Sequence, residues 1–286
     1  MHPDQLPVTP ETVRGLVAAQ FPQWRDLPVR ELAPGTVNAV FRLGDALVAR
    51  FPLQPGGADG LRAEAEAAVK LAAHTRFAVP EPVAFGAPGP GYPLPWSVLT
   101  WVPGDVAGAS SDGLAEDLAE LIADLRGIPT EGRTFGGRGR GGRIAAQDEW
   151  MRTCFANSEG LLDVPRLRRL WADLRDRPRG DAPDVTSHGD LMPGNVLVRA
   201  GRLTGVIDVG GLGPADPALD LVGAWHLLDA GPRAALRSRL GCDEAEWQRG
   251  RAWAFVQSMG LVWYYRRSNP GMAGIGRRTL ARVLAS

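Results

Sequence analysis

The chain has 286 residues, 44% of them hydrophobic, so it can fill the core of one large domain or of two lobes, which excludes a disordered or fibrous protein. Basic and acidic residues both number 32, so no overall charge attracts nucleic acid, an anionic membrane or a polycation. Cys154 and Cys242 lie far apart without a metal-binding motif, which argues against a disulfide scaffold or a structural zinc and indicates buried thiols.

The amino-terminal part of the chain predicts a helix followed by three strands. It begins with polar residues and prolines, and no stretch of the chain reaches the roughly 18 consecutive apolar residues of a membrane span, so we expect a cytoplasmic protein without membrane contact. Thr9, Pro10 and Glu11 form the start of a helix whose apolar residues recur at helical spacing. Extended segments at 29–32, 39–43 and 46–51, separated by tight turns, predict three antiparallel strands.

A second helix and two further strands complete this first part. Residues 61–74 place Leu61, Ala65 and Leu71 on one apolar face, and the prolines at 80 and 82 end the helix. Residues 83–86 and 96–102 have the composition of strands. Pro103 and Gly104 then mark the expected boundary between two lobes.

Beyond this boundary the pattern is mostly helical, interrupted by one strand pair. Helices are predicted around residues 113–126, 145–156, 164–175, 219–229, 243–265 and 273–285. The sequence GRTFGGRGRGGR, residues 132–143, resembles an RGG-type nucleic-acid tail, but it is short and enclosed by helices, which favours an ordinary loop. The predicted architecture is α+β, with a small strand-rich lobe and a larger helical lobe that contains a hairpin.

The predicted hairpin, residues 195–208, brings together three polar side chains. If it turns at Ala200 and Gly201, Asn195 and Asp208 lie near its open end, where neighbouring strands are about 4.8 Å apart, and Asp190 lies in the loop that precedes it. Two carboxylates and a carboxamide are oxygen ligands that suit Mg²⁺, and the Asp-x-x-x-x-Asn spacing is that of kinase catalytic loops. The alternative is that all three are turn formers or a strand terminator. His188 is expected to brace the loop rather than act as a base.

The sequences HGDLMPGN (188–195) and GVIDVGGLGPADPALDLVGAW (205–225) closely resemble the aminoglycoside phosphotransferase family, which has the protein-kinase fold. PGTVNAVFRLG, LVARFP and YPLPWSVLTWVPG resemble that family's nucleotide loop, third strand and hinge, and the resemblance extends to the closing helices. It implies a protein-kinase-like bilobal fold, with a nucleotide-binding lobe over residues 1–102 and a catalytic, substrate-binding lobe over 103–286. The implied activity is phosphoryl transfer from ATP or GTP to a hydroxyl of a small molecule.

The resemblance also implies roles for individual residues of the second lobe. Asp190 would be the catalytic aspartate, and Asn195 and Asp208 would hold Mg²⁺ on the phosphates of the nucleotide. Asp220 would be the buried aspartate that fixes the catalytic loop, with a helix N-cap as its alternative role. A glycine at position 211, where relatives often have a polar residue, leaves open whether one or two metal ions bind.

The nucleotide-holding residues of the first lobe depart more from the family pattern. Gly35, Thr36, Val37 and Asn38 occupy the turn that would cover the phosphates, although the stretch lacks a G-x-G-x-x-G motif and also fits a plain hairpin loop. Arg50 stands where kinases place the phosphate-binding lysine, and its planar guanidinium can bind phosphate and a carboxylate together. Glu64 is the expected carboxylate partner of Arg50, with Glu66 as the competitor.

Purine and acceptor binding follow from the same resemblance. The purine would contact the hinge at Thr100, Trp101 and Val102. The acceptor would lie between the loops around residue 190 and the terminal helices, and we expect a monomer or weak homodimer. An acidic group formed by Asp243, Glu244 and Glu246 either attracts ammonium groups of the acceptor or simply matches the dipole of a helix start.

Three alternatives to an antibiotic kinase remain at this stage. The first is a kinase of another metabolite. The second is a nucleotide-binding regulator of the same fold with weak turnover, suggested by Arg50 and Gly211. The third is an RNA-binding protein that uses the Gly/Arg stretch, and the absence of a basic field disfavours it.

Overall fold

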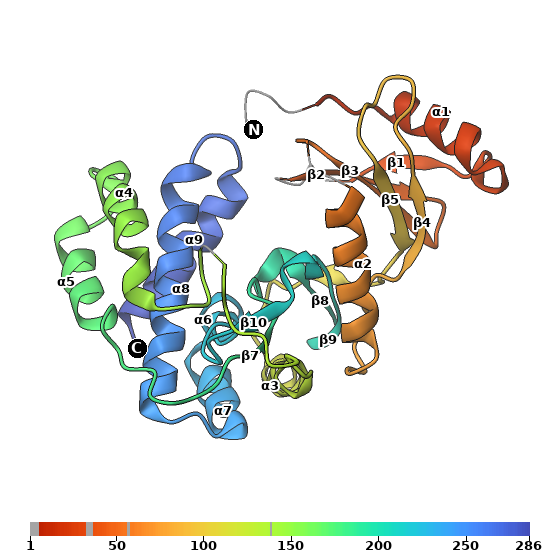
Figure 1. The fold of residues 1–286 in the computed structure, drawn as a ribbon. Helices are drawn as coiled ribbons and strands as arrows, with labels where there is room; N and C mark the ends of the chain where they lie inside the picture. The colour runs from red at the N-terminus through yellow and green to blue at the C-terminus, as the bar shows by residue number, and fades with distance from the viewer. Residues whose placement is uncertain (1–5, 33–36, 56–57, 138) are drawn as a thin grey trace. The chain divides into compact units, whose positions relative to one another are not determined.

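The computed structural model describes residues 6–32, 37–55, 58–137 and 139–286, with only the backbone of Ala58. The chain forms two compact units (Figure 1). The first contains the described residues up to Ala73 together with Ala78–Pro103, and the second contains His74–Phe77 together with Gly104–Ser286. Residues 74–77 belong to the second unit because Arg76 binds two of its carboxylates, those of Asp117 at 2.8 Å and Glu120 at 2.6 Å.

Helix α1 (Pro10–Gln20) begins as the sequence predicted. The hydroxyl of Thr9 accepts a hydrogen bond from the backbone N–H of Thr12 at 3.2 Å, and Pro10 occupies the first helical position, where its missing N–H costs nothing. Val13, Leu16 and Val17 are buried and lie on one face at helical spacing. This face packs into the core of the sheet that follows.

The sheet of the first unit is antiparallel throughout and has the strand order β1-β2-β3-β5-β4. Its strands are β1 (Val29–Glu31), β2 (Asn38–Leu43), β3 (Leu47–Pro52), β4 (Pro82–Gly86) and β5 (Trp96–Thr100), and helix α2 (Ala58–Ala72) connects β3 to β4. All five strands and α2 were predicted, with α2 beginning and ending earlier than expected.

Aromatic side chains dominate the core of this sheet. The rings of Phe51 and Trp96 are stacked with centroids 4.8 Å apart, and Tyr92 meets Phe51 edge-on at 5.0 Å. Burying one such side chain as completely as Phe51 stabilises the fold by about 1.5–3 kcal/mol. Gly86 leaves room for the indole of Trp96, since a Cβ at this position would lie 1.9 Å from it. The first unit therefore rests on an apolar core.

The second unit is mainly helical, which confirms the α+β class. Its helices are α3 (Asp112–Gly127), α4 (Asp148–Ser158), α5 (Val164–Leu174), α6 (Val222–Leu227), α7 (Ala230–Leu240), α8 (Glu244–Tyr264) and α9 (Pro270–Leu284). Figure 1 shows α4 and α5 beside the long helix α8, which also packs against α6 and α9. Residues 252–262 of α8 are all buried, so this part of the helix is surrounded by the protein.

Short strands and one unpredicted helix complete the second unit. The predicted hairpin is present as β8 (Val196–Arg199) and β9 (Arg202–Val206), with β6 (Asp105–Val106) paired to β8. The antiparallel pair formed by β7 (Val185–Ser187) and β10 (Gly213–Ala215) was not predicted. Helix α7 was also missed, since only Arg233 and Leu236 of its residues are buried and the apolar period is therefore weak.

Both cysteines are buried, as predicted, and neither is a nucleophile. Burial raises the pKa of the Cys154 thiol to about 11 and that of the Cys242 thiol to about 11. Both therefore stay protonated at neutral pH. Within the part of the chain that the structure describes, no helix has the length and apolar character needed to cross a lipid bilayer.

Candidate active site

The loop that carries Asp190 is held by a buried carboxylate. Asp220 is 3% exposed, and its two oxygens accept hydrogen bonds from the backbone N–H groups of His188 at 3.0 Å and Gly189 at 2.8 Å. Gly189 has φ +79°, a backbone conformation that glycine adopts without steric cost. The residue is not a helix N-cap, because α6 is preceded by Leu221, so the loop-fixing arrangement is the one present.

His188 braces the same loop, as the sequence analysis expected. Its Nδ1 accepts from the backbone N–H of Asp190 at 3.3 Å, which requires the ring hydrogen to be on Nε2. Nε2 lies 3.1 Å from the carbonyl oxygen of Ile207 and donates to it. With both ring nitrogens used and 1% of the residue exposed, His188 is closed to a substrate.

Asn195 turns its amide nitrogen toward Asp190. Nδ2 donates to the backbone oxygen of Asp190 at 2.9 Å and to its Oδ2 at 2.9 Å. Since the amide nitrogen is committed in this way, the carbonyl oxygen Oδ1 points elsewhere and has no protein donor among the described residues. Asp190 and Asn195, the predicted Asp-x-x-x-x-Asn pair, are therefore in direct contact through Nδ2 of Asn195, and Oδ1 of Asn195 has no part in this contact.

Asp208 follows the hairpin in a conformation that few residues adopt. Its φ of +62° and ψ of +53° place it in the left-handed region, where aspartate and asparagine are tolerated best. The side chain is exposed, and the backbone of its neighbour Ile207 donates to the carbonyl of Asn195 at 2.9 Å. A bulge between Leu197 and Val198 shifts the register, so that Asn195 lies opposite Ile207 and Asp208 comes next.

Two further side chains bind Asp190 that the sequence analysis did not identify. Arg140 donates through Nη2 to Oδ1 of Asp190 at 3.0 Å and to the carbonyl oxygen of Gly189 at 3.1 Å. Gln257, on α8, donates through Nε2 to the same Oδ1. Oδ1 thus has two donors and Oδ2 has one, the amide of Asn195.

This arrangement leaves one acceptor position on the carboxylate of Asp190. A carboxylate offers about four lone-pair sites, two on each oxygen. Among the described residues, three are taken by protein donors, and the remaining one is on Oδ2. Because the side chain of Asp190 is 34% exposed, a solute can reach it. The geometry suits a carboxylate that accepts one further hydrogen bond in a fixed direction.

The Gly/Arg stretch is a pinned loop rather than a tail. The carbonyl of Gly139 accepts from Nε2 of Gln147 at 2.6 Å, and that of Gly141 accepts from the backbone N–H of Asp216 at 2.7 Å. Gly139 and Gly141 have φ of +98° and +118°, values open mainly to glycine. The two glycines therefore hold the backbone on both sides of Arg140 and aim its side chain at Asp190.

In the first unit, Arg50 pairs with Glu64, its expected partner. The guanidinium of Arg50, on β3, donates through Nη1 to Oε1 of Glu64, on α2, and the two side chains are 14% and 20% exposed. The pair is partly buried, so solvent screens it less than an exposed ion pair. Arg50 thus pairs with a helix glutamate as the lysine of kinases does, with a guanidinium in place of the ammonium group.

The structure describes only some of the other residues that were predicted to bind the nucleotide. Gly35 and Thr36 lie outside the described residues, and Asn38 begins β2 opposite Pro52. In the hinge, the N–H of Thr100 donates to the carbonyl of Glu81 at 2.9 Å, and that of Trp101 donates to the carbonyl of Ala46 at 2.8 Å. These two amides are committed to the sheet.

Val102 differs from its two neighbours in the hinge. Its backbone N–H has no acceptor among the described residues, and its side chain is 5% exposed. The next residue, Pro103, has no N–H to donate. Of the three predicted hinge amides, only that of Val102 is without an acceptor in the described part of the chain.

The acidic group at the start of α8 makes its contacts within the protein. Asp243 caps α8 by accepting from the N–H of Glu246 at 2.7 Å. Glu244 pairs with Arg237 at 2.8 Å, and Glu246 pairs with Arg126 at 2.5 Å. The carboxylates are used within the protein, so the dipole-matching alternative is the one that holds. Trp225, Trp247 and Trp253 are buried in the core.

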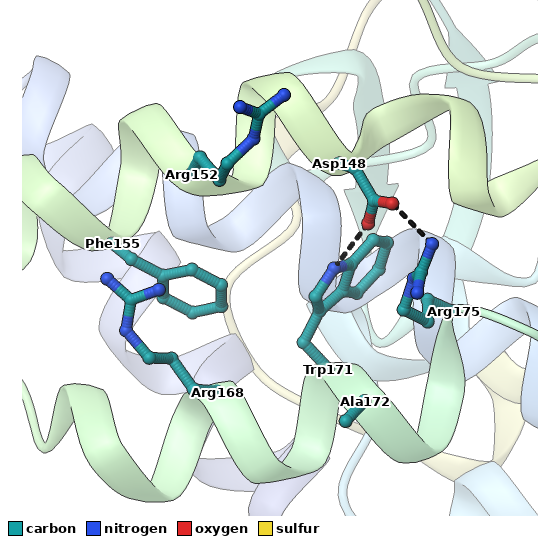
Figure 2. A pocket seen from close by; sticks show the side chains of 7 residues that line it. All are labelled: Asp148, Arg152, Phe155, Arg168, Trp171, Ala172 and Arg175. Atoms are coloured by element: carbon teal, nitrogen blue, oxygen red, sulfur yellow. Dashed lines mark hydrogen bonds and ion pairs between the residues drawn. The ribbon is translucent and has the colours of Figure 1, made fainter.

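A cavity of about 370 Å³ lies between α4 and α5 (Figure 2). Its lining residues are Asp148, Arg152, Phe155, Arg168, Trp171, Ala172 and Arg175. Figure 2 shows both oxygens of Asp148 in use, one accepting from the indole of Trp171 at 2.9 Å and the other from Arg175. No residue that contacts Asp190 lines this cavity, so it is separate from the candidate active site.

Comparison with known sequences gives a family and several relatives. A model of the phosphotransferase enzyme family matches residues 28–253. An aminoglycoside 3'-phosphotransferase from Streptomyces fradiae is 36% identical over 151 residues, which are 47% of this chain and 53% of that protein. One from Escherichia coli is 26% identical over 143 residues, covering 46% and 52%. Each match thus spans about half the length of the curated relative.

Comparison with solved structures shows the same fold over nearly the whole chain. The GDP and kanamycin complex of APH(2")-IIia superposes with a TM-score of 0.73 at 21% identity, covering 96% of this chain and 98% of that one. Macrolide 2'-phosphotransferase MphH from Brachybacterium faecium gives a TM-score of 0.62 at 18% identity, covering 95% and 97%. At these identities the similarity concerns the fold alone.

Proposed function

The chain belongs to the phosphotransferase enzyme family, as its motifs predicted, and on that premise we propose that it transfers the γ-phosphoryl group of ATP or GTP to a hydroxyl of an aminoglycoside-like small molecule. The observation that carries the proposal is the carboxylate of Asp190, held by three donors with one acceptor position left. The relative from Streptomyces fradiae, an aminoglycoside 3'-phosphotransferase, supports the acceptor class.

Asp190 orients the acceptor hydroxyl and takes its proton. The hydroxyl donates to the remaining position on Oδ2, which directs a lone pair of its oxygen toward the γ-phosphorus. As the new P–O bond forms, the bond from the γ-phosphorus to the β,γ-bridging oxygen breaks and the nucleoside diphosphate leaves with that electron pair. The hydroxyl proton passes to Asp190, and most of the rate enhancement comes from alignment and charge neutralisation.

The donors near Asp190 fit a magnesium ion. Oδ1 of Asn195 has no protein donor among the described residues, and the carboxylate of Asp208 is exposed on a left-handed turn. Two oxygen ligands of this kind suit an ion that keeps several waters and completes its coordination with substrate phosphates. We assign Asn195 and Asp208 as its ligands; when bound, Mg²⁺ neutralises charge on the phosphates.

Arg140 brings a positive charge to the reacting group. Its guanidinium lies 3.0 Å from Oδ1 of Asp190 and has further N–H groups that the contacts with Asp190 and Gly189 do not use. In phosphoryl transfer, charge spreads over the equatorial oxygens of the phosphoryl group, and arginine stabilises it. Arg140 both fixes Asp190 and places a cation beside the transferring group.

The first unit holds the nucleotide. Arg50, paired with Glu64, binds phosphate oxygens through its guanidinium. The N–H of Val102 is the hinge donor to the purine, because Thr100 and Trp101 have committed theirs to the sheet. We also assign Asn38, the first residue of β2, to the segment that covers the phosphates.

An acceptor screen tests the proposal. The protein is incubated with ATP or GTP and Mg²⁺, and nucleoside diphosphate is measured with each member of a panel of aminoglycosides, macrolides and simple amino sugars. We expect at least one aminoglycoside to stimulate nucleotide consumption and to gain one phosphate by mass spectrometry. If only another compound of the panel is phosphorylated, the proposed aminoglycoside acceptor is wrong. If nucleotide is consumed and no acceptor gains a phosphate, the proposed function is rejected.

A further inference from the structure

A buried chain of three side chains lies behind the carboxylate of Asp190. Gln257 on α8 donates to Oδ1 of Asp190, and its own Oε1 lies 3.2 Å from Nε2 of His226 on α6. Nδ1 of His226 lies 2.8 Å from the hydroxyl of Thr279 on α9. Gln257, His226 and Thr279 are 6%, 4% and 0% exposed, so water cannot replace any of these contacts.

When His226 is neutral, the hydrogen bonds from Asp190 to the histidine ring can have only one direction. An ionised Asp190 can only accept, so Gln257 must face it with its amide nitrogen and turn its carbonyl oxygen to His226. Nε2 of His226 must then carry the hydrogen and donate to that oxygen. Nδ1 is then an acceptor, and the hydroxyl of Thr279, 2.8 Å away, is the donor within its reach. The hydroxyl also lies 3.0 Å from the carbonyl of Ile275, its alternative acceptor.

The environment of His226 agrees with this direction. Burial lowers the pKa of His226 to about 4, so the ring is neutral at neutral pH and has one N–H. A neutral ring with its hydrogen on Nε2 is the form that the chain requires. The opposite tautomer would place two acceptors, Nε2 and the oxygen of Gln257, against each other without a hydrogen between them.

We propose that Gln257, His226 and Thr279 are positioning residues that set the orientation of the Asp190 carboxylate from inside the protein. This inference rests on the proposed function. Arg140 binds Oδ1 from a loop, whereas Gln257 binds it from α8, where the second donor restricts rotation about the Cβ–Cγ bond. With Oδ1 fixed, the remaining acceptor position of Oδ2 keeps one direction, which is the direction from which the acceptor hydroxyl must approach.

A pair of substitutions at Thr279 tests the far end of the chain. Thr279→Val keeps the side-chain shape but removes the donor to His226, and Thr279→Ser keeps the hydroxyl. We expect the valine variant to lower kcat about threefold to tenfold, the range for one lost hydrogen bond, without changing KM for the nucleotide, and the serine variant to stay near wild type. Gln257→Leu, which removes the direct contact with Asp190, should lower kcat further.

The tautomer of His226 provides a readout that needs no turnover. Nitrogen-15 NMR of labelled protein distinguishes a ring protonated on Nε2 from one protonated on Nδ1. We expect Nε2–H in the wild type, in Thr279→Ser and in Thr279→Val, because Oε1 of Gln257 holds that hydrogen, and a mixture of tautomers in Gln257→Leu, which removes this acceptor. Nδ1–H in the wild type, or an unchanged kcat in both Thr279→Val and Gln257→Leu, would overturn the inference. A wild type with the expected tautomer and no phosphorylated acceptor would instead reject the proposed function.

Discussion

The two units hold their functional side chains in different ways. In the first unit, Arg50 and Glu64 form one ion pair beside an aromatic, apolar core. In the second, Asp190 is held by Arg140, Asn195 and Gln257, and this group continues through buried polar side chains to α9. The first arrangement is an ion pair between a strand and a helix, whereas the second depends on several side chains that must all be placed correctly around one carboxylate.

This difference predicts different consequences of substitution. An ion pair of this kind contributes mainly charge and direction to a bound phosphate, so its loss weakens binding. A network that directs one carboxylate contributes to the reacting geometry, so its loss reduces turnover. Side chains of the first unit should therefore affect KM for the nucleotide, and those of the second should affect kcat.

The largest effect in this comparison is expected at Arg50. Arg50→Ala removes a charge-assisted contact worth about 1.5–3 kcal/mol, so KM for the nucleotide should rise roughly 10- to 150-fold. Arg50→Lys keeps the charge and is the matched control, with a smaller rise. Steady-state kinetics at saturating acceptor measures both. A wild-type KM in Arg50→Ala would remove the first unit from nucleotide binding.

Arg140→Ala tests the second unit, where we expect a change in kcat rather than in KM for the nucleotide. We expect kcat to fall roughly tenfold to a hundredfold, because Asp190 loses one donor and the phosphoryl group loses a cation, while KM for the nucleotide stays unchanged. Arg143→Ala, an exposed arginine three positions along the same stretch, is the control and should behave as wild type. An equal effect of the two substitutions would contradict a specific role for Arg140.

The buried polar network should make stability depend on pH. His226 has a pKa of about 4 in the folded protein against an ordinary value of 6.5, so the unfolded chain binds the extra proton first as pH falls. The free energy of unfolding should be highest above pH 6.5 and decrease by roughly 3 kcal/mol toward pH 4.

Chemical denaturation at pH 7.5 and pH 5 measures this contribution. His226→Asn should remove this part of the decrease, and His74→Asn, which changes an exposed histidine, should keep it. Identical pH dependence in the wild type and His226→Asn would show that His226 is not the group responsible.

The smallest effect is expected at the cap of α1, in the first unit. Thr9→Ala removes the acceptor for the N–H of Thr12 and should lower the free energy of unfolding by about 1 kcal/mol, with no change in kcat. Thr9→Ser keeps the cap and should restore stability. Thermal unfolding of the three proteins is the measurement, and a change in kcat would mean that stability and turnover are not separate.

The sequence predicted the local features of both units. Helix starts such as Thr9-Pro10, the strands of the sheet and the hairpin after Asn195 depend on residues close together in the chain, and these were found. The pairing of Arg50 with Glu64 was also predicted, since both lie in elements with clear patterns. Helix α7 was missed because its buried face is too small to give a period.

The partners of Asp190 were harder to predict because they come from distant parts of the chain. Arg140 and Gln257 lie in a loop and on a helix whose distance from Asp190 depends on the packing of the whole unit. One signal was available for Arg140, since glycines on both sides of a single arginine indicate a constrained loop. The buried pair of Arg249 and Asp216, at 3.2 Å, had no such signal.

The central claim is that Asp190 directs transfer and does not bind the nucleotide. Asp190→Asn keeps the size of the side chain but cannot accept the hydroxyl proton in the same way. Transfer of labelled γ-phosphate and nucleotide affinity, measured on the same protein sample, test this directly. We predict that transfer falls by at least about a hundredfold while affinity stays within about twofold of wild type. Normal transfer in Asp190→Asn would contradict the account.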